Sequence, residues 1–69
     1  MGLQDDSGRD EIRRRIESMK WHQFSRLLEK CRMSQVRNAF NESEKPADWA
    51  ETFLTQMILV GVNAVDVFA

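Results

Sequence analysis

Residues 46–61, PADWAETFLTQMILVG, contain a helix start, a helix stop and an unbroken apolar stripe. Pro46 suits the first helical turn, where its missing N–H removes no hydrogen bond, and Gly61 is a typical helix terminator. Asp48 and Glu51 place negative charge near the positive end of the helix dipole. The stripe expected to face the core comprises Trp49, Ala50, Phe53, Leu54, Met57 and Ile58. We therefore expect the rest of the chain to pack around this one helix.

The basic first half predicts two amphipathic helices, over residues 10–20 and 21–32, with a break between them. Ile12 and Phe24 begin two apolar sets that are offset by twelve residues. At about 100° per residue this offset rotates the apolar face by roughly 120°, so one straight helix cannot hold both sets against one core. We expect the break near Lys20-Trp21-His22. The inward residues are Ile12, Ile16, Met19, Trp21, Phe24, Leu27, Leu28 and Cys31.

A short third helix is predicted after residue 33. Ser34 is expected to cap it by accepting a backbone hydrogen bond, and its expected inward residues are Val36, Ala39 and Phe40. Residues 41–45, NESEK, predict a polar linker, because Pro46 disfavours helical geometry at the residue before it.

The segment after residue 61 has two interpretations. Asn63 is a candidate cap for a last helix in which Ala64, Val65 and Phe68 face the core. The β-branched run is also compatible with an extended segment. We prefer the helix, because a lone strand would have no partner elsewhere in the predicted chain.

One domain is expected over residues 10–69. Residues 1–9 have no apolar periodicity and predict a flexible leader, with Ser7 or Asp10 as candidate caps of the first helix. The predicted architecture is all-α, a small bundle of four or five short antiparallel helices. Because the chain ends on apolar Val67-Phe68-Ala69, it is also compatible with a fragment of a longer protein.

The sequence contains few groups for chemistry. With 69 residues and one cysteine, it cannot form an internal disulfide, and His22 with Cys31 falls short of a four-ligand zinc set. It has no glycine-rich phosphate loop and no nucleophile elbow. We therefore expect a protein that is not an enzyme and uses neither a cofactor nor a metal.

The polar, acidic start differs from a signal peptide, and no apolar run reaches the roughly 20 residues of a membrane helix. A location in the cytoplasm or nucleus, away from the membrane, is expected on these grounds.

Charge is distributed unevenly although the net charge is only −1. Residues 9–37 hold nine Lys and Arg against four acids, whereas residues 38–69 hold one Lys against five acids. Such a separation favours head-to-tail association or an acidic ligand on the basic half. The candidate partner-binding residues are Arg13, Arg14, Arg15 and Arg26 on the basic side and Glu42, Glu44, Asp48 and Glu51 on the acidic side.

Nucleic-acid binding by the basic half, residues 9–37, is the alternative, with residues 34–41 as a short recognition helix. The pI of about 5.7 is low for such a protein. The recognition helix would offer only Arg37 and Asn38 to base edges. Protein binding is therefore preferred.

Several segments in order resemble the death-fold superfamily, and caspase-recruitment domains in particular. They are FSRLL at 24–28, SQVR at 34–37, WAETFL at 49–54 and AVDVF at 64–68. The resemblance covers about residues 10–69 and implies a bundle of antiparallel helices that associates homotypically through oppositely charged faces, often into filaments. It implies an adaptor or signalling role. The chain departs from the family in that five helices are counted where the family has six.

Overall fold

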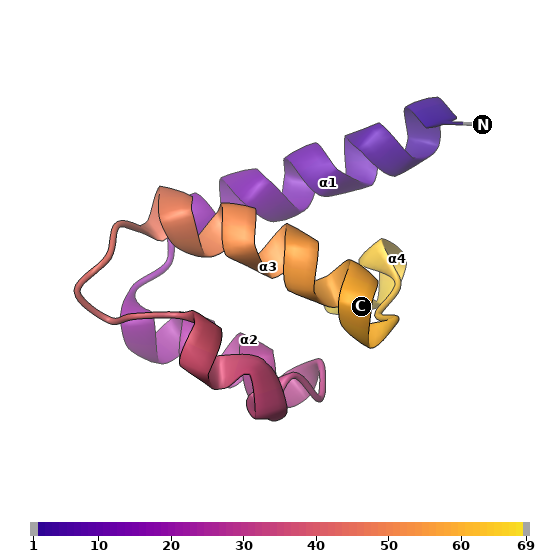
Figure 1. The fold of residues 1–69 in the computed structure, drawn as a ribbon. Coiled ribbons are helices and arrows are strands. Elements are labelled where there is room, and N and C mark those ends of the chain that lie inside the picture. The colour runs from indigo at the N-terminus through magenta and orange to yellow at the C-terminus, as the bar shows by residue number, and fades with distance from the viewer. Residues whose placement is uncertain (1, 69) are drawn as a thin grey trace.

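The computed structural model describes residues 2–68, with side chains described from residue 8 onward. Over this range the chain is mostly helical and contains no strand. The elements are α1 (Gly2–Glu17), α2 (Trp21–Lys30), the 3-10 helix η1 (Ser34–Ala39), α3 (Pro46–Val60) and α4 (Ala64–Val67). In Figure 1, α3 lies between α1 and the α2–η1 pair, and α1 and α3 run in opposite directions. The all-α small bundle is confirmed.

The hydrophobic core is centred on α3, as expected. Its buried residues are Ile12, Ile16, Phe24, Leu27, Leu28, Met33, Phe40, Trp49, Ala50, Phe53, Leu54, Met57 and Val67. The Phe24 ring stacks on Trp49 with centroids 5.3 Å apart and an interplanar angle of 8°. It also meets Phe40 at 4.8 Å and Phe53 at 5.9 Å, both edge-on. One ring of α2 therefore joins the end of η1 to α3.

Both predicted ends of α3 are confirmed. Lys45 is extended, with φ −77° and ψ 149°, and the helix begins at Pro46. Gly61 adopts the left-handed conformation with φ 88°. The N–H groups of Gly61 and Val62 both donate to the carbonyl oxygen of Met57, each at 2.9 Å. This hydrogen-bonding pattern is typical of a helix that ends on a left-handed glycine.

The predicted break between the first two helices is also confirmed, since α1 ends at Glu17 and α2 begins at Trp21. The side-chain oxygen of Gln23 accepts a hydrogen bond of 2.9 Å from the backbone N–H of Lys20. This bond satisfies a backbone donor at the start of α2 and fixes the angle at which the chain enters it.

Arg32 ends α2 in the left-handed conformation, with φ 58°. Its N–H donates to the Glu29 carbonyl at 3.1 Å, and the N–H of Met33 donates to the Leu28 carbonyl at 2.8 Å. This is the Schellman pattern, in which glycine usually occupies the position taken here by arginine. The left-handed conformation costs a non-glycine residue roughly 1–2 kcal/mol.

The two left-handed positions predict opposite mutational effects. Gly61→Ala should lower the free energy of unfolding by about 1 kcal/mol through backbone strain alone, because a Cβ there meets no atom within 4 Å. Arg32→Gly should raise it by up to about 1 kcal/mol. Urea denaturation followed by circular dichroism measures both. A Gly61→Ala variant as stable as the wild type would contradict this account.

The predicted boundaries of α1 were wrong. The helix begins at Gly2 rather than Asp10, so the expected leader 1–9 is helical from Gly2 on, and Ser7 and Asp10 lie inside the helix instead of capping it. Helix propagation is cooperative, so an established helix extends at little cost. Packing also favours the extension, because a Cβ at Gly8 would lie 3.4 Å from the Cβ of Ala64 in α4.

Several predicted inward residues are exposed instead. Ile58 is 59% exposed and Val65 is 81% exposed, while the neighbouring Val67 is fully buried. Ile58 follows Trp49 by nine residues, which places it about 180° away around the helix. Ala39 is also exposed. α4 therefore docks through Val67, and Ile58 remains on the surface.

Two predicted caps were also wrong in detail. Ser34 is the first residue of η1, which follows Met33, and makes no capping bond within the described chain. Asn63 does precede α4, which confirms a helix there, but its side chain caps no backbone donor of the described residues.

Candidate functional site

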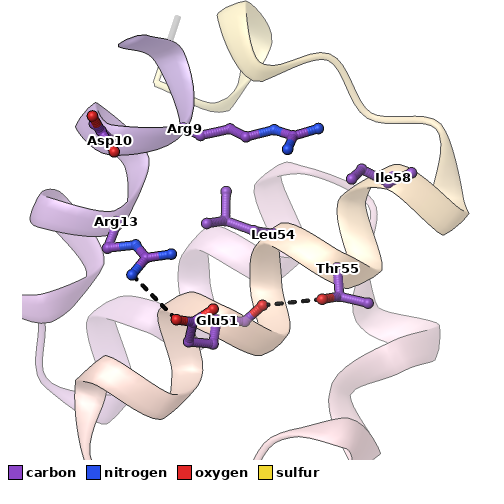
Figure 2. A pocket seen from close by; sticks show the side chains of 7 residues that line it. All are labelled: Arg9, Asp10, Arg13, Glu51, Leu54, Thr55 and Ile58. Carbon is purple, nitrogen blue, oxygen red and sulfur yellow. Dashed lines mark hydrogen bonds and ion pairs between the residues drawn. The ribbon is translucent and has the colours of Figure 1, made fainter. Parts of the chain in front are cut away.

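A surface groove runs between α1 and α3 and continues to α4. Its first part is a hollow of about 500 Å³, shown in Figure 2 and lined by Arg9, Asp10, Arg13, Glu51, Leu54, Thr55 and Ile58. A smaller hollow adjoins it and is lined by Arg9, Leu54, Met57, Ile58, Val62, Asn63 and Ala64. Because Arg9, Leu54 and Ile58 line both hollows, we treat them as one surface, the α1–α3 groove.

The floor of the α1–α3 groove is apolar. Leu54 is 8% exposed and Met57 is buried, whereas Ile58 stands 59% exposed at the edge. Leu59 follows at 74% exposure outside the groove. Large apolar side chains at such exposure, next to a hollow with charged edges, are typical of surfaces that bind other proteins.

The charges of the α1–α3 groove differ in their partners. Arg13 forms an ion pair with Glu51, with Nη1 and Oε1 3.1 Å apart. Arg9 forms no ion pair with the residues that the structure describes, and Figure 2 shows it reaching across the groove above Leu54. Arg9 is therefore the cation of the groove that remains available to a ligand.

The predicted basic residues fall on separate surfaces. Besides the Arg13 pair, Arg15 binds Glu11 through Nε and Oε2 at 2.7 Å and lies 4.7 Å above the Phe68 ring. The hydrogen bond and the charge of Arg15 lower the pKa of the Glu11 carboxyl. Arg14 is exposed, and its Nε donates a long hydrogen bond of 3.5 Å to the Asp10 carbonyl. Arg26 is exposed on α2.

Three of the four predicted acidic residues lie in the linker and the first turn of α3. Glu42 and Glu44 are exposed in the linker, and Asp48 is exposed in the first turn of α3. None of these three forms an ion pair within the described part of the chain. Glu51, the fourth, is the partner of Arg13 and belongs to the groove. We call Glu42, Glu44 and Asp48 the acidic set.

The linker that carries Glu42 and Glu44 is held in place. The indole Nε1 of Trp49 donates to the Asn41 carbonyl at 2.8 Å. The Asn41 side-chain oxygen accepts from the N–H and the hydroxyl of Ser43, at 3.2 and 3.0 Å. An Asx turn anchored on a core tryptophan therefore presents the acids on an ordered loop.

Sequence reasoning missed Arg9 and misplaced Ile58. A helix extended back beyond Asp10 would have placed Arg9 one turn from Arg13 on the same face, since residues four apart are neighbours on a helix. The spacing of the two arginines was the available signal. Ile58 carried no local signal, because its exposure depends on which elements cover α3.

The remaining groups with chemical potential are dispersed. His22 is exposed on α2. Among the described residues, no three His, Cys, Asp or Glu side chains are grouped to hold a metal ion, and no helix has the length and apolarity to cross a membrane.

Cys31 is expected to react slowly with iodoacetamide. Burial raises the pKa of its thiol, and the charge of Asp66 adds to this while that of Lys30 opposes it. Because the native thiol holds its proton more tightly than the unfolded one, its contribution to the free energy of unfolding is fully present at pH values below the unfolded-state pKa of about 8.5. This contribution is lost as the pH rises through the native pKa. Mass spectrometry of alkylation at pH 8, native against urea-unfolded, measures the effect. Equal rates would contradict it.

Comparisons of the chain with protein-family models, with curated proteins and with solved structures find no match.

Proposed function

We propose that this chain is a non-catalytic protein–protein interaction module that self-associates or recruits a related helical domain through oppositely charged surfaces. The observation that carries the proposal is the acidic set, three exposed carboxylates that form no ion pair within the described chain, together with exposed Arg14 and Arg26 on other elements. An adaptor or signalling role in the cytoplasm or nucleus, as in death-fold proteins, is part of the same proposal.

The placement of the charges supports contacts between unlike surfaces. The acidic set lies in the linker and the first turn of α3, whereas Arg14 lies in the last turn of α1 and Arg26 lies on α2. If the acidic set of one copy meets the basic residues of the next, each copy keeps one free surface of each kind. Such head-to-tail contacts generate open chains or rings.

Arg13 and Glu51 contribute less to this association than the sequence alone indicates, because each has a partner within the same molecule. An exposed ion pair contributes only about 0–1 kcal/mol. Several pairs must therefore act together, and their attraction must weaken in salt, since the screening length falls to about 3 Å at 1 M ionic strength.

Light scattering across a dilution series, at low and at high salt, tests the proposal. Assemblies heavier than the 8.1 kDa monomer that dissociate in salt would support it. The double variant Glu42→Arg with Glu44→Arg should remain monomeric with an unchanged far-UV circular dichroism spectrum. Glu29→Arg, which reverses an exposed acid on α2, is the matched control and should assemble normally.

Mixing experiments strengthen the test. A variant with Arg14→Glu and Arg26→Glu should also be monomeric, and mixing it with the Glu42→Arg, Glu44→Arg variant should restore association. Assembly of the wild type that is unaffected by either charge reversal would reject the proposed surfaces. A wild type that stays monomeric at every condition would remove self-association and leave a related domain as the partner.

Nucleic-acid binding remains the second candidate of the sequence, and it is less favoured because Arg13 and Arg15 already pair with acids. It predicts a gel shift with duplex DNA or RNA at low salt. The logarithm of the affinity would then fall by about 0.9 per neutralised phosphate for each tenfold rise in salt. Failure to shift at low salt would exclude it.

A further inference from the structure

We propose that the α1–α3 groove binds an amphipathic α-helix of another protein, with apolar residues of that helix on Leu54 and Ile58 and a carboxylate on Arg9. This goes beyond the charged-surface association above, because it concerns a different surface and a partner of different chemistry. It does not require the chain to self-associate.

The apolar part of the site has helical spacing. Leu54 and Ile58 lie four residues apart on α3 and line the α1–α3 groove, and Val62, just after the end of α3, lines its smaller hollow. Side chains four residues apart form a ridge on a helix, and such a ridge fits into a groove between the ridges of a second helix. A partner with apolar residues at i, i+4 and i+7 or i+8 would cover this ridge and remove the exposed part of Ile58 from water.

The positive charge in the middle of the groove is suited to an anionic ligand. Arg9 is the charged residue common to both hollows, and it has no ion pair within the described chain. The Arg13 charge is already matched by Glu51. Figure 2 shows Asp10 at the edge of the groove, away from the part that Arg9 crosses. A guanidinium beside an apolar floor is suited to a carboxylate on the polar edge of a bound helix.

The backbone of the groove walls favours a helix over an extended ligand. Both walls are helices, and the described chain has no strand edge to which an extended peptide could add. A ligand lying on this apolar floor must therefore satisfy its own backbone hydrogen bonds, as a helix does. From Glu51 to Val60, α3 rises roughly 14 Å at 1.5 Å per residue, which matches two to three turns of a bound helix.

Fluorescence anisotropy with two labelled peptides tests the proposal. Both are alanine-based helices of about five turns, long enough to be helical in water. They carry leucine at i, i+4 and i+8 and differ in one residue beside the middle leucine, glutamate or lysine. The glutamate peptide should bind the wild type roughly three- to tenfold more tightly than the lysine peptide, because one gains an attraction and the other a repulsion, and Arg9→Glu should reverse this preference.

Two further variants define the surface. Ile58→Ser should abolish binding of the glutamate peptide, and its urea denaturation should show that the fold is retained, since Ile58 is 59% exposed. Lys20→Glu is the matched control, because Lys20 is exposed, lies outside the groove lining and should leave binding unchanged. Equal effects of Arg9→Glu and Lys20→Glu would show that only the overall charge of the protein matters, and they would overturn the proposal.

The outcomes separate this proposal from the proposed function. No saturable binding of either peptide up to millimolar concentration would overturn the groove proposal, while the light-scattering result for self-association would stand. If the glutamate peptide dissolves wild-type assemblies in proportion to its occupancy, a second copy occupies the groove, and the assignment to another protein is overturned. Peptide binding by a monomeric wild type would support the groove proposal alone.

Discussion

Phe24→Ala is expected to unfold most of the protein at 25 °C. Phe24 is fully buried, and its ring contacts Trp49, Phe40 and Phe53. Truncating a buried phenylalanine to alanine costs about 3–5 kcal/mol through lost burial and the cavity left behind. A domain of this size has a net stability of only about 3–5 kcal/mol. The expected result is therefore a loss of most helical signal in the absence of denaturant.

Far-UV circular dichroism and urea denaturation measure this loss. Leu59→Ala is the control, because Leu59 is 74% exposed and its truncation should change the free energy of unfolding by no more than about 0.5 kcal/mol. A cooperative urea transition for Phe24→Ala with a midpoint near that of the wild type would show that Phe24 does not hold α2 and α3 together.

Met33→Ala is expected to cost about 2–5 kcal/mol, the second largest effect. Met33 is fully buried although it lies in the turn between α2 and η1. Its backbone N–H closes the end of α2 on the Leu28 carbonyl at 2.8 Å. A hydrophobic contact of the residue at this position commonly accompanies that hydrogen bond. Truncation should therefore loosen η1 and the end of α2 together.

Met33→Leu is the matched comparison. It conserves the volume of the side chain and should cost less than about 1.5 kcal/mol. The difference between the two urea midpoints separates the effect of the lost side-chain volume from that of the turn between α2 and η1. Equal destabilisation by alanine and leucine would mean that methionine is required for its shape, and unchanged stability of Met33→Ala would mean that the turn does not depend on this side chain.

The sequence predicts α3 and most of the core because the signals involved are local. Pro46 and Gly61 act through backbone geometry that needs no neighbours, and both bound the observed helix. Helical spacing correctly placed Phe24, Trp49 and Phe53 in the core. Such signals follow from the shape of a helix, whatever it packs against.

The errors concern contacts between distant segments. The early start of α1 is linked to Gly8 packing on Ala64, which no local pattern reports. Helical periodicity identifies the apolar face of α3 but not how much of that face the neighbouring elements cover. Ile58 was therefore wrongly predicted to face the core. The candidate basic residues were chosen from their order in the chain, and the structure pairs Arg13 with Glu51, a residue from the opposite candidate set.

The position of α1 has a consequence for biosynthesis. α1 packs along α3, yet α2, η1 and the linker separate the two in the chain. At 5–20 residues per second, about 2–9 s pass on the ribosome between completion of Glu17 and of Val60. During this interval the side of α1 that carries Ile12 and Ile16 lacks its partner. Chains whose synthesis stops before α3 should therefore be substrates for chaperones and proteases, because the apolar side of α1 is covered only once α3 has been made.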